Sequence, residues 1–205
     1  MRNPRTDAQM RVRYTFRCIA NQWQKLPQQE MKAYNQYAND HKNTRIGNLT
    51  GFQCFVRLNM KYHEVNENKS DFIKPPSRDY LFPIITGVED IILPREKPLL
   101  KIKIKTMEAK PIDEQSLKVY VMASSQQSPG RIVPNRKCNF LTVKEFKVNE
   151  LGECEIDVTK EYKEKFGILG EYVKVFFKVC LVNKLTGESD LMQEMTMRTK
   201  HSSEQ

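Results

Sequence analysis

Histidine and cysteine are the residues in this sequence best suited to acid–base, nucleophilic or metal chemistry, and both are sparse. The three histidines, His41, His63 and His201, are separated by predicted helices and loops, and no serine or cysteine partner lies at a catalytic spacing, so surface positions are favoured. The cysteines, at positions 18, 54, 138, 154 and 180, form no CxxC pair, which indicates buried thiols rather than disulfides or a zinc site. Phosphate-loop, hydrolase and metalloprotease motifs are missing too. We therefore expect no enzyme, no cofactor and no metal.

Basic side chains are the main candidates for binding. The chain carries a net charge of +9, and residues 1–80 hold most of it, with 14 lysines and arginines against 7 acidic residues. Guanidinium groups that could contact phosphates or an acidic partner gather at the start of the chain: Arg2, Arg5, Arg11, Arg13 and Arg17. A second basic row consists of Lys101, Lys103 and Lys105. For both sets the alternative is a solvated surface, because helices and exposed sheets need a polar side.

Three helices are predicted in the first part of the chain, and the first begins at a capping box formed by Thr6 and Gln9. Apolar residues at three- and four-residue spacing then mark one side of a helix that runs to about residue 25. We place Phe16 and Trp23 on this core side, together with Val12, Ile19, Ala20 and Leu26. The arginines lie mostly off it.

Pro27 ends the first helix and begins the second, since proline is tolerated only in a first helical turn. Thr50 and Gln53 repeat the capping box before a third helix that is apolar nearly all round, which is typical of a central helix, with Phe55 among its core residues. Asn59 lies within that helix. A buried amide needs hydrogen-bond partners, typically in a loop or a neighbouring helix, so we expect a structural role for Asn59, such as clamping residues 44–49.

Alternation with a period of two residues replaces the helical spacing after Pro75 and Pro76. About seven short strands follow, and they predict an antiparallel sandwich of the immunoglobulin or fibronectin type III kind. In such domains a tyrosine at a sheet corner bonds to upstream backbone; Tyr172 is placed to do so, unless it is an ordinary strand residue. The expected organisation is α+β, with a three-helix unit at 1–74, a linker at 75–80, a sandwich at 81–200 and a polar tail at 201–205.

The helical region resembles uncharacterised proteins of bacteriophages and phage-like elements, several of them from Bacteroidota. Their shared pattern is N-P-x-T-x-x-Q-x-x-x-R-x-x-F, then W-x-x-L, an aromatic pair before alanine, and G-x-x-L-[ST]-G-x-x-x-F-x-x-x-N. The matching positions are Asn3, Pro4, Thr6, Gln9, Arg13, Phe16, Trp23, Leu26, Tyr34, Tyr37, Ala38, Gly47, Leu49, Thr50, Gly51, Phe55 and Asn59. Tyr34 stands where tryptophan is commoner, and a glycine- and lysine-rich segment found in some relatives is missing. The resemblance implies virion structural or assembly proteins and no activity.

These observations predict a non-enzymatic structural or assembly protein, a component of a phage head, connector or tail, that docks through its helices and presents the sandwich. Its expected partners are other virion proteins or further copies of itself. The alternatives are a nucleic-acid-binding accessory protein that uses the first helix and, third, a module that recognises a carbohydrate or host surface. Since no signal peptide or membrane-spanning run is visible, we expect assembly in the host cytoplasm and no membrane partner.

Overall fold

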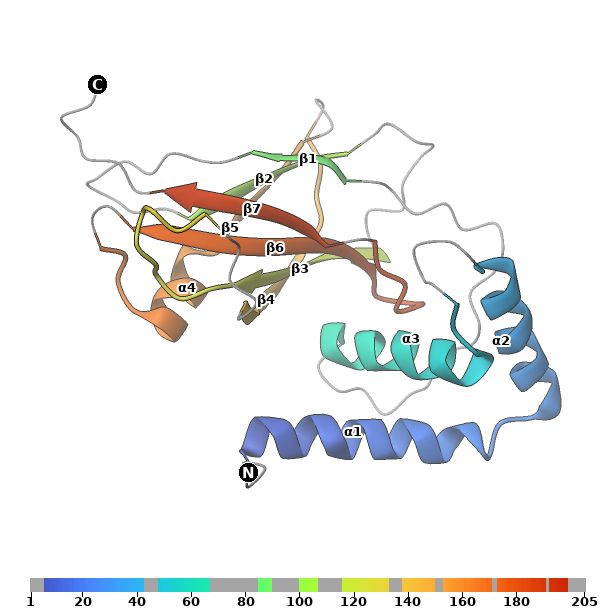
Figure 1. Ribbon diagram of the computed structural model, residues 1–205. Helices are drawn as coiled ribbons and strands as arrows, with labels where there is room; N and C mark the ends of the chain where they lie inside the picture. The colour runs from blue at the N-terminus through green and yellow to red at the C-terminus, as the bar shows by residue number, and fades with distance from the viewer. Residues whose placement is uncertain are drawn as a thin grey trace. The chain divides into compact units, whose positions relative to one another are not determined.

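The protein is an α+β protein. The computed structural model describes residues 6–42, 48–66, 85–89, 100–106, 116–132, 138–149, 153–170, 173–190 and 192–198, and over these ranges it has four helices and two antiparallel sheets (Figure 1). Several predicted features lie outside the described residues: Arg2, Arg5, Tyr172, His201, the linker at 75–80 and the tail at 201–205.

The chain divides into two compact units. One consists of Met1–Tyr80 together with Asn183–Ser189, and the other of Leu81–Val182 together with Asp190–Gln205. The first, which we call the helical unit, contains helices α1 (Asp7–Trp23), α2 (Gln28–Asp40) and α3 (Gly51–Val65). Residues 183–189, which the sequence analysis placed inside a continuous 81–200 segment, belong instead to this unit.

Side-chain caps fix where α1 and α3 begin. The Thr6 hydroxyl accepts from the Gln9 N–H at 3.4 Å, but the Gln9 side-chain oxygen has no hydrogen-bond partner, so the expected box is only half formed. At α3 both halves are present, because the Thr50 hydroxyl accepts from the Gln53 N–H and the Gln53 side chain accepts from the Thr50 N–H. Each cap satisfies backbone donors that the helix itself leaves without a partner.

The core of the helical unit is an aromatic cluster at the junction of the three helices. Tyr34 and Phe55 are fully buried, with ring centroids 5.2 Å apart and rings nearly perpendicular. Trp23 packs on both and also on Phe52, with centroid distances of 5.4 to 6.1 Å. Such edge-to-face pairs contribute beyond the burial of apolar area. The core therefore lies where the C-terminal part of α1 meets α2 and α3.

Phe16 does not belong to this core: it is 47% exposed, and Ile19 is the one buried residue of α1. The prediction was wrong because hydrophobic spacing shows which side of a helix faces a neighbour, but not how many of its turns the neighbour covers. Trp23, two turns further along, is the part of the same side that is covered.

Asn59 is fully buried, and its partners are helical. Its amide nitrogen donates to the Phe55 carbonyl at 2.9 Å, one turn earlier in α3, and its side chain also hydrogen-bonds to Tyr34. Burial raises the pKa of Tyr34, so the hydroxyl keeps its proton. The amide thus joins α2 to α3. Of the loop that it was expected to clamp, residues 44–47 lie outside the described part of the chain.

The turn at 183–189 packs its backbone directly against α3. The Asn183 side-chain oxygen accepts from the Leu185 and Thr186 N–H groups and so closes the turn, and Gly187 has a φ of +69°. A Cβ at Gly187 would lie 2.1 Å from the Leu58 carbonyl oxygen. Asn66, at the end of α3, donates to the Lys184 carbonyl at 2.7 Å. Glycine is required here by the close approach and by the left-handed backbone.

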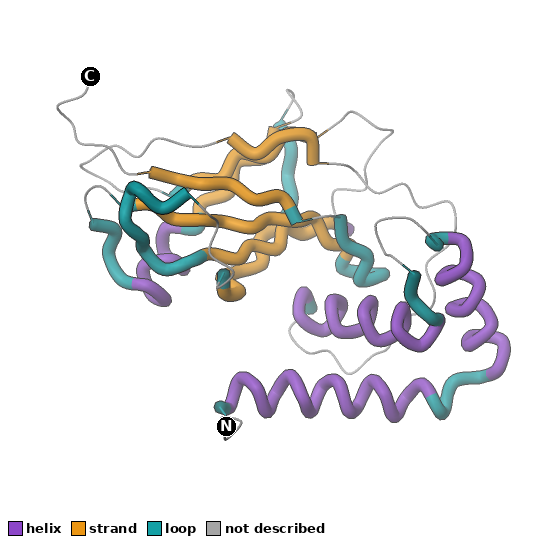
Figure 2. Tube along the Cα trace, in the orientation of Figure 1, coloured by secondary structure: helices purple, strands orange, loops and turns teal. Residues whose placement is uncertain are grey.

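The second unit holds the strands, drawn in orange in Figure 2. One sheet has the order β1-β2-β5 and the other the order β4-β3-β6-β7. The strands are β1 (Ile85–Glu89), β2 (Lys101–Thr106), β3 (Leu117–Ala123), β4 (Asn139–Glu145), β5 (Glu153–Asp157), β6 (Lys174–Asn183) and β7 (Gln193–Arg198). Ile102 and Ile104 of β2 are buried, as is Leu100 just before the strand, so alternate residues face the core as the period of two predicted.

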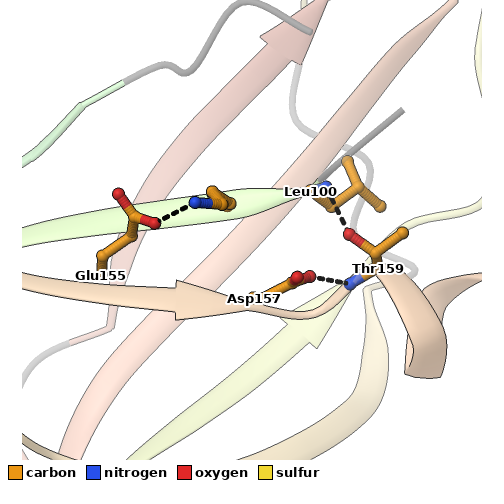
Figure 3. Close-up of polar contacts among 5 residues, drawn as sticks. Leu100, Glu155, Asp157 and Thr159 are labelled. Carbon is orange, nitrogen blue, oxygen red and sulfur yellow. Dashed lines mark hydrogen bonds and ion pairs between the residues drawn. The ribbon is translucent and has the colours of Figure 1, made fainter. Parts of the chain in front are cut away.

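A short helix, α4 (Thr159–Phe166), follows β5 and was not anticipated from the sequence. Its start is fixed by two hydrogen bonds, from the Thr159 N–H to Asp157 Oδ1 at 2.8 Å and from the Leu100 N–H to the Thr159 hydroxyl at 2.7 Å (Figure 3). Tyr162 of this helix is fully buried in the sheet core and donates to the Ser124 carbonyl at 3.2 Å. This bond to upstream backbone is of the kind expected from Tyr172.

Candidate interaction surface

Helix α1 exposes a group of apolar and basic side chains that its neighbours leave uncovered. Tyr14 is 70% exposed and Val12 is 55% exposed, and the other members of the group are exposed as well. We call this group the α1 surface; it consists of Met10, Arg11, Val12, Arg13, Tyr14, Phe16 and Arg17. Scattered exposed apolar residues are ordinary, but a cluster within two turns of one helix indicates a binding surface.

The arginines of the α1 surface have no carboxylate partner among the described residues. Arg11, Arg13 and Arg17 form no salt bridge there, and the single acidic residue of α1 is Asp7 in its first turn. Structural arginines are usually held by carboxylates or carbonyls. Guanidinium groups beside exposed apolar side chains instead have the composition of a protein interface.

The lysine row of β2 is arranged differently. Lys103 pairs with Glu153 at 2.8 Å, Lys105 pairs with the same carboxylate at 3.6 Å, and Lys101 pairs with Glu155. The Lys103 ammonium lowers the pKa of Glu153. These charges are compensated within their own sheet, which favours the solvated-surface interpretation over a polyanion contact.

A pocket beside the start of α3 holds no group that is typical of catalysis. Its volume is about 410 Å³, and its lining offers amides and one lysine but no carboxylate, histidine or thiol: Asn35, Ala38, Asn39, Lys42, Asn48, Leu49, Thr50 and Gly51. Of the predicted surface histidines, His63 is buried instead, and His41 stacks on Tyr37. All five cysteines are thiols, and four of them are buried. No group of side chains suited to a metal ion occurs in the described ranges.

Glu188, in the turn at 183–189, is a half-buried carboxylate with a raised pKa. Its carboxylate accepts from the Tyr37 hydroxyl at 2.8 Å and from the Thr186 hydroxyl at 3.0 Å. Burial raises the pKa of Glu188, although these hydrogen bonds and nearby His41 oppose the shift. The arrangement joins the turn to α2, so we assign it to stability.

This carboxyl group should make the stability of the helical unit depend on pH. The pKa of Glu188 is higher in the folded protein than its ordinary value of about 4.5. The stabilisation that the carboxyl group provides is therefore complete below about pH 4.5, and it is lost as the pH rises through the pKa of the folded state. We expect the native protein to lose stability relative to Glu188→Gln as the pH rises from about 4.5 through the pKa of the folded state. The difference between their free energies of unfolding should fall accordingly. Fluorescence of Trp23, the single tryptophan, measures it. Glu64→Gln removes the charge of an exposed carboxylate as the control, and equal slopes for the two variants would contradict the assignment.

Sequence reasoning found the arginines of α1 but missed half of the surface. It assigned Val12 and Phe16 to the core and gave no role to Met10 and Tyr14. The signal was present in the spacing, since Met10 and Tyr14 are four residues apart on the side opposite Ile19 and so could not have packed in the same core.

No family model, curated protein or solved structure matches the chain. Within the described residues, no helix combines the length and the apolar character needed to cross a bilayer.

Proposed function

We propose that this protein is a non-enzymatic structural or assembly component of a bacteriophage particle, and that it docks onto the assembly through its helical unit. One observation carries the proposal: α1 exposes arginines that have no carboxylate partner among the described residues, and these arginines lie beside apolar side chains such as Tyr14. The phage context comes from the sequence resemblance in the first 60 residues. The lysines of β2 are paired with glutamates of their own sheet, which leaves the arginines of α1 as the better basic candidates for binding.

The part presented by the docked protein is a fibronectin type III-like sandwich formed by the strands of the second unit, Leu81–Val182 together with Asp190–Gln205. Support comes from the strand order, in which the first, second and fifth strands form one sheet and the fourth, third, sixth and seventh form the other. In constant-type immunoglobulin domains the fourth strand lies beside the fifth, whereas here it pairs with the third. The buried residues of both sheets belong to one hydrophobic cluster, as two sheets packed face to face require.

The docking role is tested by composition of purified particles. We expect the protein at a fixed copy number in nuclease-treated, density-purified particles from cells that carry its gene, measured by quantitative mass spectrometry. Arg11→Gln/Arg13→Gln/Arg17→Gln should lower that number several-fold while leaving the circular dichroism spectrum unchanged, because glutamine is nearly as good a helix former as arginine. The matched control is Lys101→Gln/Lys103→Gln/Lys105→Gln in the paired row. A protein missing from the particles would refute the proposal.

Nucleic-acid binding is the second candidate, and the same three arginines favour it. Duplex and single-stranded DNA binding, measured between 50 and 300 mM salt, separates the two functions. Three phosphate contacts would give a slope of log K against log salt of up to about −3, whereas an apolar protein contact depends weakly on salt. We expect weak DNA binding that is lost near physiological salt; tight binding that tracks this slope would reverse the order of the candidates.

A further inference from the structure

We infer that the outer side of α1 binds a partner protein whose contact surface is acidic around an apolar centre. This rests on the proposed function, because it names the class of partner for the same surface. The inference commits to one side of the helix and to one charge sign, and the following observations carry it.

The helix geometry defines the outer side. At 3.6 residues per turn, Met10, Tyr14 and Arg17 lie on one side of α1, since they are four and seven residues apart. Ile19 and Trp23 follow the same spacing on the side that packs on the aromatic cluster. An offset of two residues corresponds to about 200° of rotation, so the outer side points away from the core of the helical unit.

The outer side has the anatomy of a binding hot spot. Tyr14 and Met10 form its apolar centre, and Arg11 and Arg13 flank them on either side. Tyrosine, methionine and arginine are the residue types enriched in protein interfaces, and a tyrosine anchor is ordered at little entropic cost because it has few rotatable bonds.

Charge decides which protein can occupy this side. A second copy presenting the same side would bring its three arginines against the same three arginines, and like charges facing each other in an interface are unfavourable. The glutamates Glu153 and Glu155 are already paired with lysines of their own sheet. A partner with carboxylates of its own, arranged around a patch that accepts Tyr14, complements this side best.

A membrane surface and a nucleic acid fit the outer side less well. A helix that lies in a bilayer interface needs its apolar residues in one stripe, whereas α1 carries Val12 and Phe16 on one side and Met10 and Tyr14 on the other. A phosphate backbone would neutralise the arginines but would leave Met10 against charged oxygens, so that burying this side chain would gain nothing.

The test is photocrosslinking from position 14 in the full-length chain. A benzoylphenylalanine replaces Tyr14, or Ile168 as a control that is 69% exposed and far from α1 in the sequence, in cells that produce the particle. We expect position 14, and not position 168, to crosslink to a protein segment with net negative charge. A crosslink to a neutral or basic protein, or to a second copy, overturns this inference and leaves the proposed docking intact. A crosslink to nucleic acid, or none above the control, overturns both.

Affinity then tests the two parts of the surface separately. The crosslinked segment, as a synthetic peptide, is titrated against the full-length protein and its variants. Tyr14→Ala should weaken binding by on the order of tenfold or more, and Tyr14→Phe should restore most of it. Arg13→Glu/Arg17→Glu should abolish binding, and exchanging glutamates of the peptide for lysines should recover it. Unchanged affinity in Tyr14→Ala, or no recovery on charge exchange, contradicts the assignment.

Discussion

Gly187→Ala is expected to lower the free energy of unfolding of the helical unit by about 2 to 5 kcal/mol. Two effects add. Alanine at a φ of +69° costs about 1 to 2 kcal/mol, and its Cβ would lie 2.1 Å from the Leu58 carbonyl oxygen and 3.2 Å from the Tyr62 nitrogen. Both are backbone atoms of α3 and cannot swing aside, so the turn at 183–189 must lift from the helix. Urea unfolding followed by Trp23 fluorescence measures the loss.

Two controls separate the close contact from the backbone strain. Gly167 has a φ of +88° and a ψ of −174°, a backbone region that is essentially restricted to glycine, and nothing lies within 4 Å of its Cβ position, so Gly167→Ala should show backbone strain without a close contact, about 1 to 3 kcal/mol, by circular dichroism. Gly187→Asn relieves much of the strain, because asparagine tolerates positive φ, but it keeps the contact. If Gly187→Asn were as stable as the native protein, the contact with Leu58 would not be what the glycine provides.

The turn at 183–189 also shows where sequence reasoning stopped. The period of two predicted the strands on either side of it, and the Thr-Gly pair predicted a turn, because those signals are local. That the turn packs on α3 depends on Gly187 meeting Leu58 across more than 120 residues of chain, and no local pattern encodes such a pairing. The same holds for the hydrogen bond between Tyr37 and Glu188.

Helix α4 was missed for a different reason. Its eight residues are too short for a clear helical period, and its one buried side chain, Tyr162, gives no repeat to detect. The surrounding strands have four or more positions each, so their alternation is readable.

For the α1 surface, composition identified the arginines, but whether a charged side chain has a partner is a tertiary property. The lysines of β2 appeared equally exposed in the sequence and proved to be paired.

Tyr34→Ala and Phe16→Ala should differ in their effect on the stability of the helical unit by several kcal/mol, although both remove an aromatic ring from a matching position of the same sequence pattern. Tyr34 is fully buried, contacts Trp23 and Phe55, and is hydrogen-bonded to Asn59, so its loss leaves a cavity and a buried amide without that partner. We expect a cost of about 3 to 5 kcal/mol.

Phe16 lies almost half in solvent, and its truncation should cost less than about 1 kcal/mol. Trp23 fluorescence follows both variants in urea, and Tyr34→Phe, which keeps the ring and loses the hydroxyl, should fall between them at about 1 to 3 kcal/mol. Because Phe16 belongs to the α1 surface, Phe16→Ala can then be used in binding experiments as a stable protein. A loss comparable to that of Tyr34→Ala would show that the core extends along α1 and that the exposed surface is smaller than the one described.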